Sequence, residues 1–172
     1  IFSFNPIALA GAAVYIVAHG LFSAGGFLTL GYVEEREETR SLAHLGGLAA
    51  ENPRLSGALL IVSLAALGLP GLAGFAGELL ILTGVYGAGY WWAALVALIP
   101  IVLAAAYMLR LFQGIMHGPK GADLPERPDL TWREGLALAP LIAGLLLLGI
   151  NPQAVAQPST GSNGGNVVAG SR

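Results

Sequence analysis

Long apolar runs alternate with short polar segments along this 172-residue chain. A helix needs about 20 mostly apolar residues to cross the hydrocarbon layer of a bilayer. Four segments meet this requirement, at residues 7–33, 55–86, 90–116 and 132–150. We therefore predict an all-α membrane protein with about four transmembrane helices. Residues 1–155 form its transmembrane domain, and residues 156–172, rich in Gly, Ser and Asn, are expected to be a flexible tail.

The second apolar segment carries an interruption, GLPGLAGFAGE, over residues 68–78. Pro70 lacks a backbone donor, and Gly71, Gly74 and Gly77 lower helix stability around it. We predict a discontinuous helix here. At membrane depth the freed backbone groups need protein or water as partners, which is typical of ion pathways. A simple kink used for packing is the alternative interpretation.

Composition and charge agree with a membrane protein. The chain is 55% hydrophobic and 10% charged, against about 25% charged residues in soluble domains. Seven of its eight Lys and Arg residues fall within segments 34–54 and 110–133. The positive-inside rule makes these segments cytoplasmic and the C-terminus periplasmic, and we expect a bacterial inner membrane as the location.

The same composition excludes several functions. Cysteine is absent, which excludes disulfides and thiolate-held zinc or iron–sulfur clusters in this chain. The net charge is −2 without a basic stripe, which argues against nucleic acid as a partner. We expect no catalytic group and no metal site here.

Glu78 is the acid that follows the interruption. A carboxylate at membrane depth costs at least about 2.5–3.5 kcal/mol on insertion scales, so its side chain should face the bundle interior or water. Desolvation favours the neutral acid, which suits a group that takes up and releases protons. The alternative is a structural carboxyl paired with a neighbouring helix.

Tyr15, His19 and Ser23 form a polar stripe on the first span, because residues four apart share a helix face. Imidazole can accept and donate a proton near neutral pH, so His19 suits a relay. A neutral histidine bonded to a backbone carbonyl is the alternative. The charge run at residues 34–40 is interpreted as a solvated helix end with local ion pairs.

Three stretches resemble the antiporter-like subunits of NADH:quinone oxidoreductase (complex I), which are related to Mrp-type sodium/proton antiporters. They are AHGLFSAG at residues 18–25, GGL at 46–48, and GLPGLAGFAGELLIL at 68–82. In this family an acid after the broken helix is typical of subunit M, whereas subunits L and N usually carry lysine. Glu78 therefore points to the M type.

The resemblance implies that the four spans are the last of about fourteen helices. Glu78 would be the ionisable residue of an outward proton half-channel, and His19 would belong to a hydrated central axis. The implied partners are L- and N-like subunits, the earlier helices of the same subunit, and lipids. NADH, flavin, iron–sulfur clusters and quinone would lie in partner subunits of the same redox-driven translocase.

Two observations limit this expectation. The chain has no initiator Met and is expected to begin partway through a longer protein, and no lysine lies in any span. We therefore expect that it does not complete a proton path alone. An Mrp-type cation/proton antiporter subunit and a non-conducting membrane scaffold remain alternatives.

Overall fold

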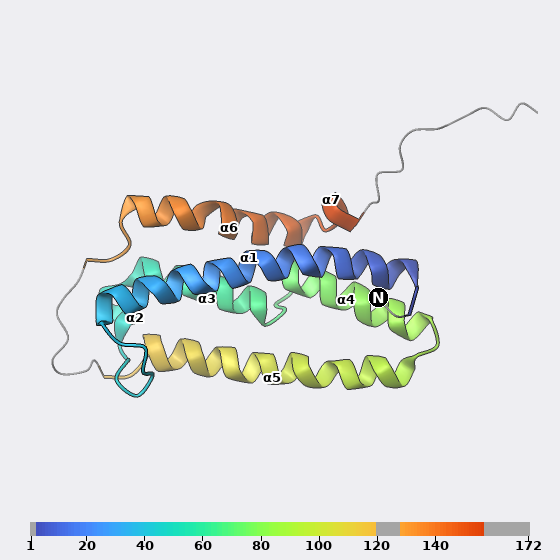
Figure 1. The fold of residues 1–172 in the computed structure, drawn as a ribbon, viewed down its shortest axis with the longest axis horizontal. Coiled ribbons are helices and arrows are strands. Elements are labelled where there is room, and N and C mark those ends of the chain that lie inside the picture. The colour runs from blue at the N-terminus through green and yellow to red at the C-terminus, as the bar shows by residue number, and fades with distance from the viewer. Residues whose placement is uncertain (1–2, 120–127, 157–172) are drawn as a thin grey trace, which may run out of the picture.

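The computed structural model describes residues 3–119 and 128–156, and these two ranges contain helices and connecting segments but no strand (Figure 1). In chain order the helices are α1 (Pro6–Glu37), α2 (Leu48–Glu51), α3 (Pro53–Ala66), α4 (Ala73–Gly87), α5 (Trp91–Met116), α6 (Trp132–Ile150) and α7 (Gln153–Ala156). The long helices run along one common direction (Figure 1). The predicted all-α fold is confirmed, while the tail at 157–172 lies outside the described residues.

Four crossings account for this arrangement. Helices α1, α5 and α6 are each long and apolar enough to cross a membrane. Helices α3 and α4 have 14 and 15 residues, which at about 1.5 Å per residue makes each too short alone. They follow each other in the same direction (Figure 1). Together they form the predicted discontinuous span, with the break at residues 67–72.

Helices α1 and α4 pack through glycines. A Cβ built on Gly77 would lie 2.9 Å from Cα of Tyr15, and one on Gly11 would lie 2.7 Å from the backbone nitrogen of Ile81. One on Gly84 would meet the backbone of Ala8. Small residues let membrane helices approach closely. This contact fixes Tyr15 of α1 beside the first turns of α4.

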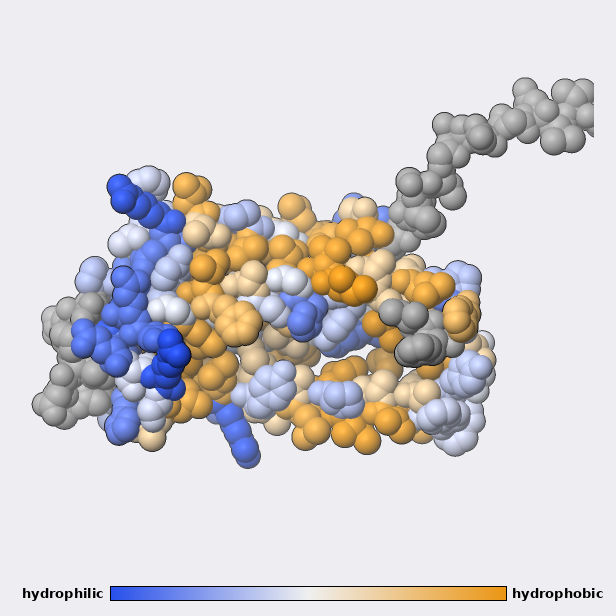
Figure 2. All heavy atoms as spheres, viewed as in Figure 1, coloured by the Kyte–Doolittle hydropathy of each residue, from blue (hydrophilic) through white to orange (hydrophobic). Residues whose placement is uncertain are grey.

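The hydrophilic side chains gather at the end of the bundle where α1 ends and α6 begins, which we call the charged end (Figure 2). There the buried Arg36 donates two hydrogen bonds to the Glu134 carboxylate, at 3.1 and 3.0 Å. Its Nε donates a third to the carbonyl of Pro128 at 3.1 Å. Glu134 also completes a capping box with Thr131 at the start of α6.

These contacts correct one sequence interpretation. Residues 34–40 are not a uniformly solvated run, because Arg36 and Glu37 are each only 5% exposed. A local ion pair does form between Arg40 and Glu34, at 2.7 Å. The difference arises because the long connection after α5 brings Glu134 back to Arg36, and local sequence spacing cannot reveal such a pair.

Asp129 caps helix α3 from a distant part of the chain. Its carboxylate accepts hydrogen bonds from the backbone amides of Arg54 at 2.8 Å, Leu55 at 3.1 Å and Leu130 at 2.7 Å. The residue in the cap position, Asn52, makes no side-chain capping bond. Desolvation opposes the charge of Asp129, but these amides and Arg54 outweigh it and hold the pKa of Asp129 below its usual range.

Candidate functional site

The break between α3 and α4 is built from Pro70 and two glycines in left-handed conformations. Gly68 has φ of 70° and Gly71 has φ of 95°, which side-chain-bearing residues rarely adopt. Gly74 and Gly77, expected to belong to the break, lie inside α4. There they allow close packing instead, Gly74 against the Ala65 carbonyl and Gly77 against Tyr15.

Glu78 is half-buried, and its side chain points back toward the break. A Cβ on Gly68 would collide with the Glu78 carboxyl group, so the absence of a side chain at Gly68 makes room for the carboxyl. Helical side chains lean toward the helix N-terminus, and the N-terminus of α4 has no side-chain cap. The carboxyl therefore lies close to the positive end of the α4 dipole, which favours an anion.

Tyr15 reaches Glu78 from the neighbouring helix. The two side chains line the same cavity and interact with each other, and the phenol can act as the donor when the carboxyl is ionised. Tyr15 holds this position because its own backbone rests against Gly77, one residue before Glu78. Of the predicted polar stripe, Tyr15 is thus the member that the structure brings to the acid.

Tyr15 and Glu78 share a cavity of about 460 Å³ between α1, α4 and α5. The space-filling view shows a gap between α5 and the rest of the bundle (Figure 2). The cavity has three polar side chains, Tyr15, Glu78 and Tyr107, and seven apolar ones: Ile81, Leu82, Ala97, Pro100, Ile101, Leu103 and Ala104. An open cavity with convergent polar groups can hold water.

His19 and Ser23 do not line this cavity. His19 is exposed, and its ring lies edge-on to Phe22 at 5.1 Å and 6.4 Å from the ring of Tyr15. Since four residues of helix rise by about 6 Å, His19 lies one turn from Tyr15 toward the charged end. The structure thus brings Tyr15 to Glu78 and leaves His19 and Ser23 in the next two turns of α1.

Tyr107 was missed by the sequence analysis. It shares one face of α5 with Pro100 and Ala104, at spacings of four and three residues, and all three line the cavity. A tyrosine following a mid-helix proline on one face of an apolar helix was the available signal. The sequence alone does not show that this face of α5 lies toward Glu78, because that depends on how α5 packs against α4.

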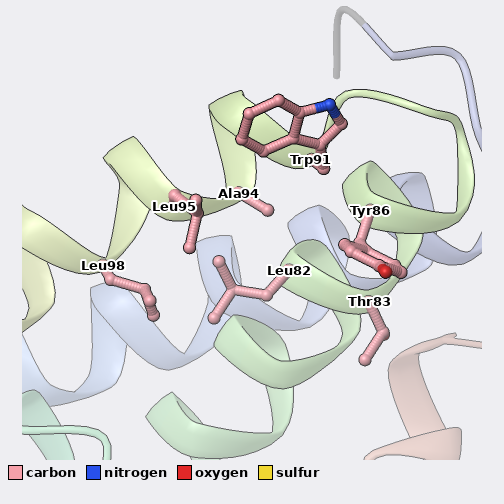
Figure 3. A pocket seen from close by; sticks show the side chains of 7 residues that line it. All are labelled: Leu82, Thr83, Tyr86, Trp91, Ala94, Leu95 and Leu98. Atoms are coloured by element: carbon pink, nitrogen blue, oxygen red, sulfur yellow. The ribbon is translucent and has the colours of Figure 1, made fainter.

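A second cavity lies farther along the same pair of helices, toward the α4–α5 connection (Figure 3). It measures about 340 Å³ and has mainly apolar walls: Leu82, Thr83, Tyr86, Trp91, Ala94, Leu95 and Leu98. Thr83 donates its hydroxyl to the Leu79 carbonyl at 2.7 Å, within its own helix. Leu82 lines both cavities and so separates the polar one from the apolar one.

In the described part of the chain, the charged groups outside the cavity do not assemble a metal site. Within residues 3–119 and 128–156, no group of three or more His, Cys, Asp or Glu side chains is placed to hold a metal ion.

Comparison with known proteins places this arrangement in a family. The profile of the family described as "NADH:quinone oxidoreductase/Mrp antiporter, TM" matches residues 1–104. "NADH-quinone oxidoreductase subunit M" of Mycobacterium tuberculosis is 41% identical over 145 residues, covering 84% of this chain and 26% of the relative. The subunit M of Rhodobacter capsulatus is 36% identical over 156 residues, covering 90% and 30%.

Solved structures show the same fold. Respiratory complex I from Thermus thermophilus with bound NADH contains a chain with a TM-score of 0.81 and 35% identity, covering 91% of this chain and 33% of that one. The Mrp complex from Dietzia contains one with a TM-score of 0.80 and 23% identity, covering 90% and 37%. The chain therefore spans about a third or less of its relatives' length, and it belongs to the NADH:quinone oxidoreductase/Mrp antiporter family of membrane proteins.

Proposed function

We propose that this chain is part of a proton-translocating subunit, of the M type, in the membrane arm of an NADH:quinone oxidoreductase. Glu78 is the group that exchanges protons, and it belongs to the half-channel that opens to the outer side. One observation carries this proposal: the Glu78 carboxyl lies at a helix break, in a cavity, with a phenol as its neighbour.

The chemistry needs no redox centre in this chain. NADH, flavin, iron–sulfur clusters and quinone would lie in partner subunits, and their energy would arrive as changes in charge and hydration around Glu78. Such a change shifts the equilibrium between the protonated and ionised carboxyl. A proton bound from one side can then leave to the other, provided that water reaches the cavity from each side in turn.

Charge distribution supports the orientation of this path. Of the five basic residues in the described ranges, four lie at the charged end: Arg36, Arg54 and Arg133 in the end turns of α1, α3 and α6, and Arg40 in the segment after α1. Under the positive-inside rule this end is cytoplasmic. The α4–α5 connection, and both α7 and the start of α1, then lie at the outer side (Figure 1).

The test is Glu78→Gln in the complete complex, reconstituted into lipid vesicles. Glutamine keeps the size and removes the exchangeable acid proton. We expect fewer protons pumped per NADH oxidised, while electron transfer to quinone in uncoupled vesicles persists. Glu34→Gln, which changes an exposed carboxylate at the charged end, is the matched control and should leave pumping intact. Unchanged pumping in Glu78→Gln would support the scaffold interpretation instead.

A second candidate function is that of a cation/proton antiporter subunit, because the chain resembles a chain of the Mrp complex. The two functions differ in partners. A subunit of the oxidoreductase copurifies with subunits that oxidise NADH and supports NADH-driven pumping. An antiporter subunit copurifies without them and exchanges sodium for protons down an imposed gradient.

A further inference from the structure

We propose that Tyr107 of α5 is a second proton-relay hydroxyl for Glu78, acting from the opposite wall of the cavity to Tyr15. This inference rests on the proposed function of Glu78. It adds helix α5 to the proton path. It also implies that protons reach Glu78 from the charged end of the bundle.

The cavity walls carry the argument. Tyr15 comes from α1, Glu78 from α4 and Tyr107 from α5, so each helix around the cavity contributes one polar side chain. The seven other lining residues are apolar. Tyr107 also lies within electrostatic range of Tyr15. In an apolar wall, these three groups are the side chains that can anchor a chain of water molecules.

The depth of Tyr107 sets its place in the path. Helices α4 and α5 meet at a short connection after Gly87, and Glu78 lies nine residues before that point. Tyr107 lies sixteen residues after Trp91, where α5 begins. At about 1.5 Å per residue, Tyr107 is roughly 10 Å farther from the connection than Glu78 is.

The direction of the Tyr107 side chain shortens this separation, and a proline adds a polar backbone group at the level of Glu78. Side chains lean toward the N-terminus of their helix, which for α5 is the end at the connection, so the phenol of Tyr107 leans toward the level of Glu78. Pro100 lies nine residues after Trp91, at about the level of Glu78, and has no N–H to donate to the carbonyl of Val96. That carbonyl is left without its usual helical donor beside a residue that lines the cavity.

The transfer balances without a change of charge on tyrosine. An excess proton enters as a hydronium ion on the charged-end side and leaves a water molecule behind. Each phenol accepts a proton on that side, while its own proton passes to the next water. The last water gives a proton to the Glu78 carboxylate, and one O–H bond forms there for each O–H bond broken at the start. Both phenols end neutral, and Glu78 becomes the neutral acid that later releases the proton.

The experiment compares Tyr107→Phe with Tyr86→Phe in the complete complex in lipid vesicles. Both tyrosines are exposed, at 60% and 67%, and both line cavities between α4 and α5, but Tyr86 lines the apolar cavity, whose walls hold no acid. We expect Tyr107→Phe to lower pumping per NADH several-fold, with unchanged thermal unfolding and unchanged quinone reduction in uncoupled vesicles. Tyr86→Phe should leave all three measurements unchanged.

Three outcomes would overturn the inference. Wild-type pumping in Tyr107→Phe would exclude the hydroxyl from the path, and if Glu78→Gln still loses pumping, the proposed function survives without Tyr107. An equal loss in Tyr86→Phe would show that any phenol between α4 and α5 matters in the same way. A loss of pumping together with a lower unfolding temperature would show that Tyr107 supports packing.

Discussion

The two halves of the interrupted span each have a carboxyl near their N-terminus, but the two carboxyls have opposite surroundings. At α3, Asp129 accepts three backbone hydrogen bonds between 2.7 and 3.1 Å. At α4, Glu78 lies beside Gly68 and Tyr15, in a cavity and without a backbone cap. The first carboxyl holds the fold together, whereas the second is the group that we propose to exchange protons.

Glu134 at the charged end differs from Glu78 in the same way as Asp129 does. Glu134 accepts two bonds from Arg36 and two from Thr131, through its backbone amide and its hydroxyl. A carboxylate so fully bonded is held in its ionised form, because protonation would break several charge-assisted bonds at once. The structural acids therefore differ from Glu78, the acid that we propose to exchange protons, in the number of hydrogen bonds that they accept.

The largest expected effect is the loss of stability that follows removal of the Arg36–Glu134 pair. Arg36→Leu removes two of the four donors to the Glu134 carboxylate and the Arg36 donor to the Pro128 carbonyl. Removing one partner of a buried pair costs about 3–5 kcal/mol, which is the upper bound for this partly buried one. Thermal unfolding of the complete subunit in detergent measures this loss. Glu78→Gln should unfold at or above the wild-type temperature, since it removes a poorly solvated acid. A destabilisation in Glu78→Gln equal to that in Arg36→Leu would contradict the contrast.

A change in packing tests whether the contact between α1 and α4 is needed to hold Tyr15 beside Glu78. Gly77→Ala pushes a methyl group against the backbone of Tyr15, and overpacking of this kind costs about 1–3 kcal/mol. It should also lower pumping, because Tyr15 moves away from Glu78. Gly20→Ala on α1, where nothing lies within 4 Å of the new methyl, is the control and should keep stability and pumping. Wild-type pumping in Gly77→Ala would show that the Tyr15 contact is dispensable.

Removing the distant cap has a smaller expected effect. Asp129→Ala leaves the amides of Arg54 and Leu55 without a side-chain acceptor, and loss of an N-cap costs about 0.5–2 kcal/mol. Unfolding in denaturant should show this loss, while pumping per NADH stays at the wild-type value in the surviving complex. A pumping defect in folded Asp129→Ala would mean that the charged end shares the function of Glu78.

The smallest effect is a dependence of stability on pH. The pKa of Asp129 is lower in the folded state than in the unfolded chain, so its contribution is complete above an unfolded pKa of about 3.9 and disappears as pH falls through the folded value. Unfolding temperatures in detergent should drop below about pH 4. Asp129→Asn should flatten this drop, and an identical drop in both proteins would assign it to other acids.

The sequence by itself determined the membrane class, the number of crossings and the broken second span. Each depends on local composition, because apolar runs of bilayer length and a proline among glycines act within a few turns of chain. It also predicted Glu78 and Tyr15 as candidate site residues, and the structure places both on one cavity. The bounds of α3 and α4 narrowed the break to residues 67–72 and placed Gly74 and Gly77 inside a helix.

Only the tertiary structure decided which groups meet. Arg36 and Glu134 are separated by 98 residues, and Asp129 and Arg54 by 75, so neither contact follows from helical spacing. Tyr107 reaches the cavity of Glu78 because α5 folds back along α4, and His19, on the same face of α1 as Tyr15, stays outside it because it lies one turn farther toward the charged end. Periodicity assigns a residue to a face, but the partner of that face is set by packing between helices distant in sequence.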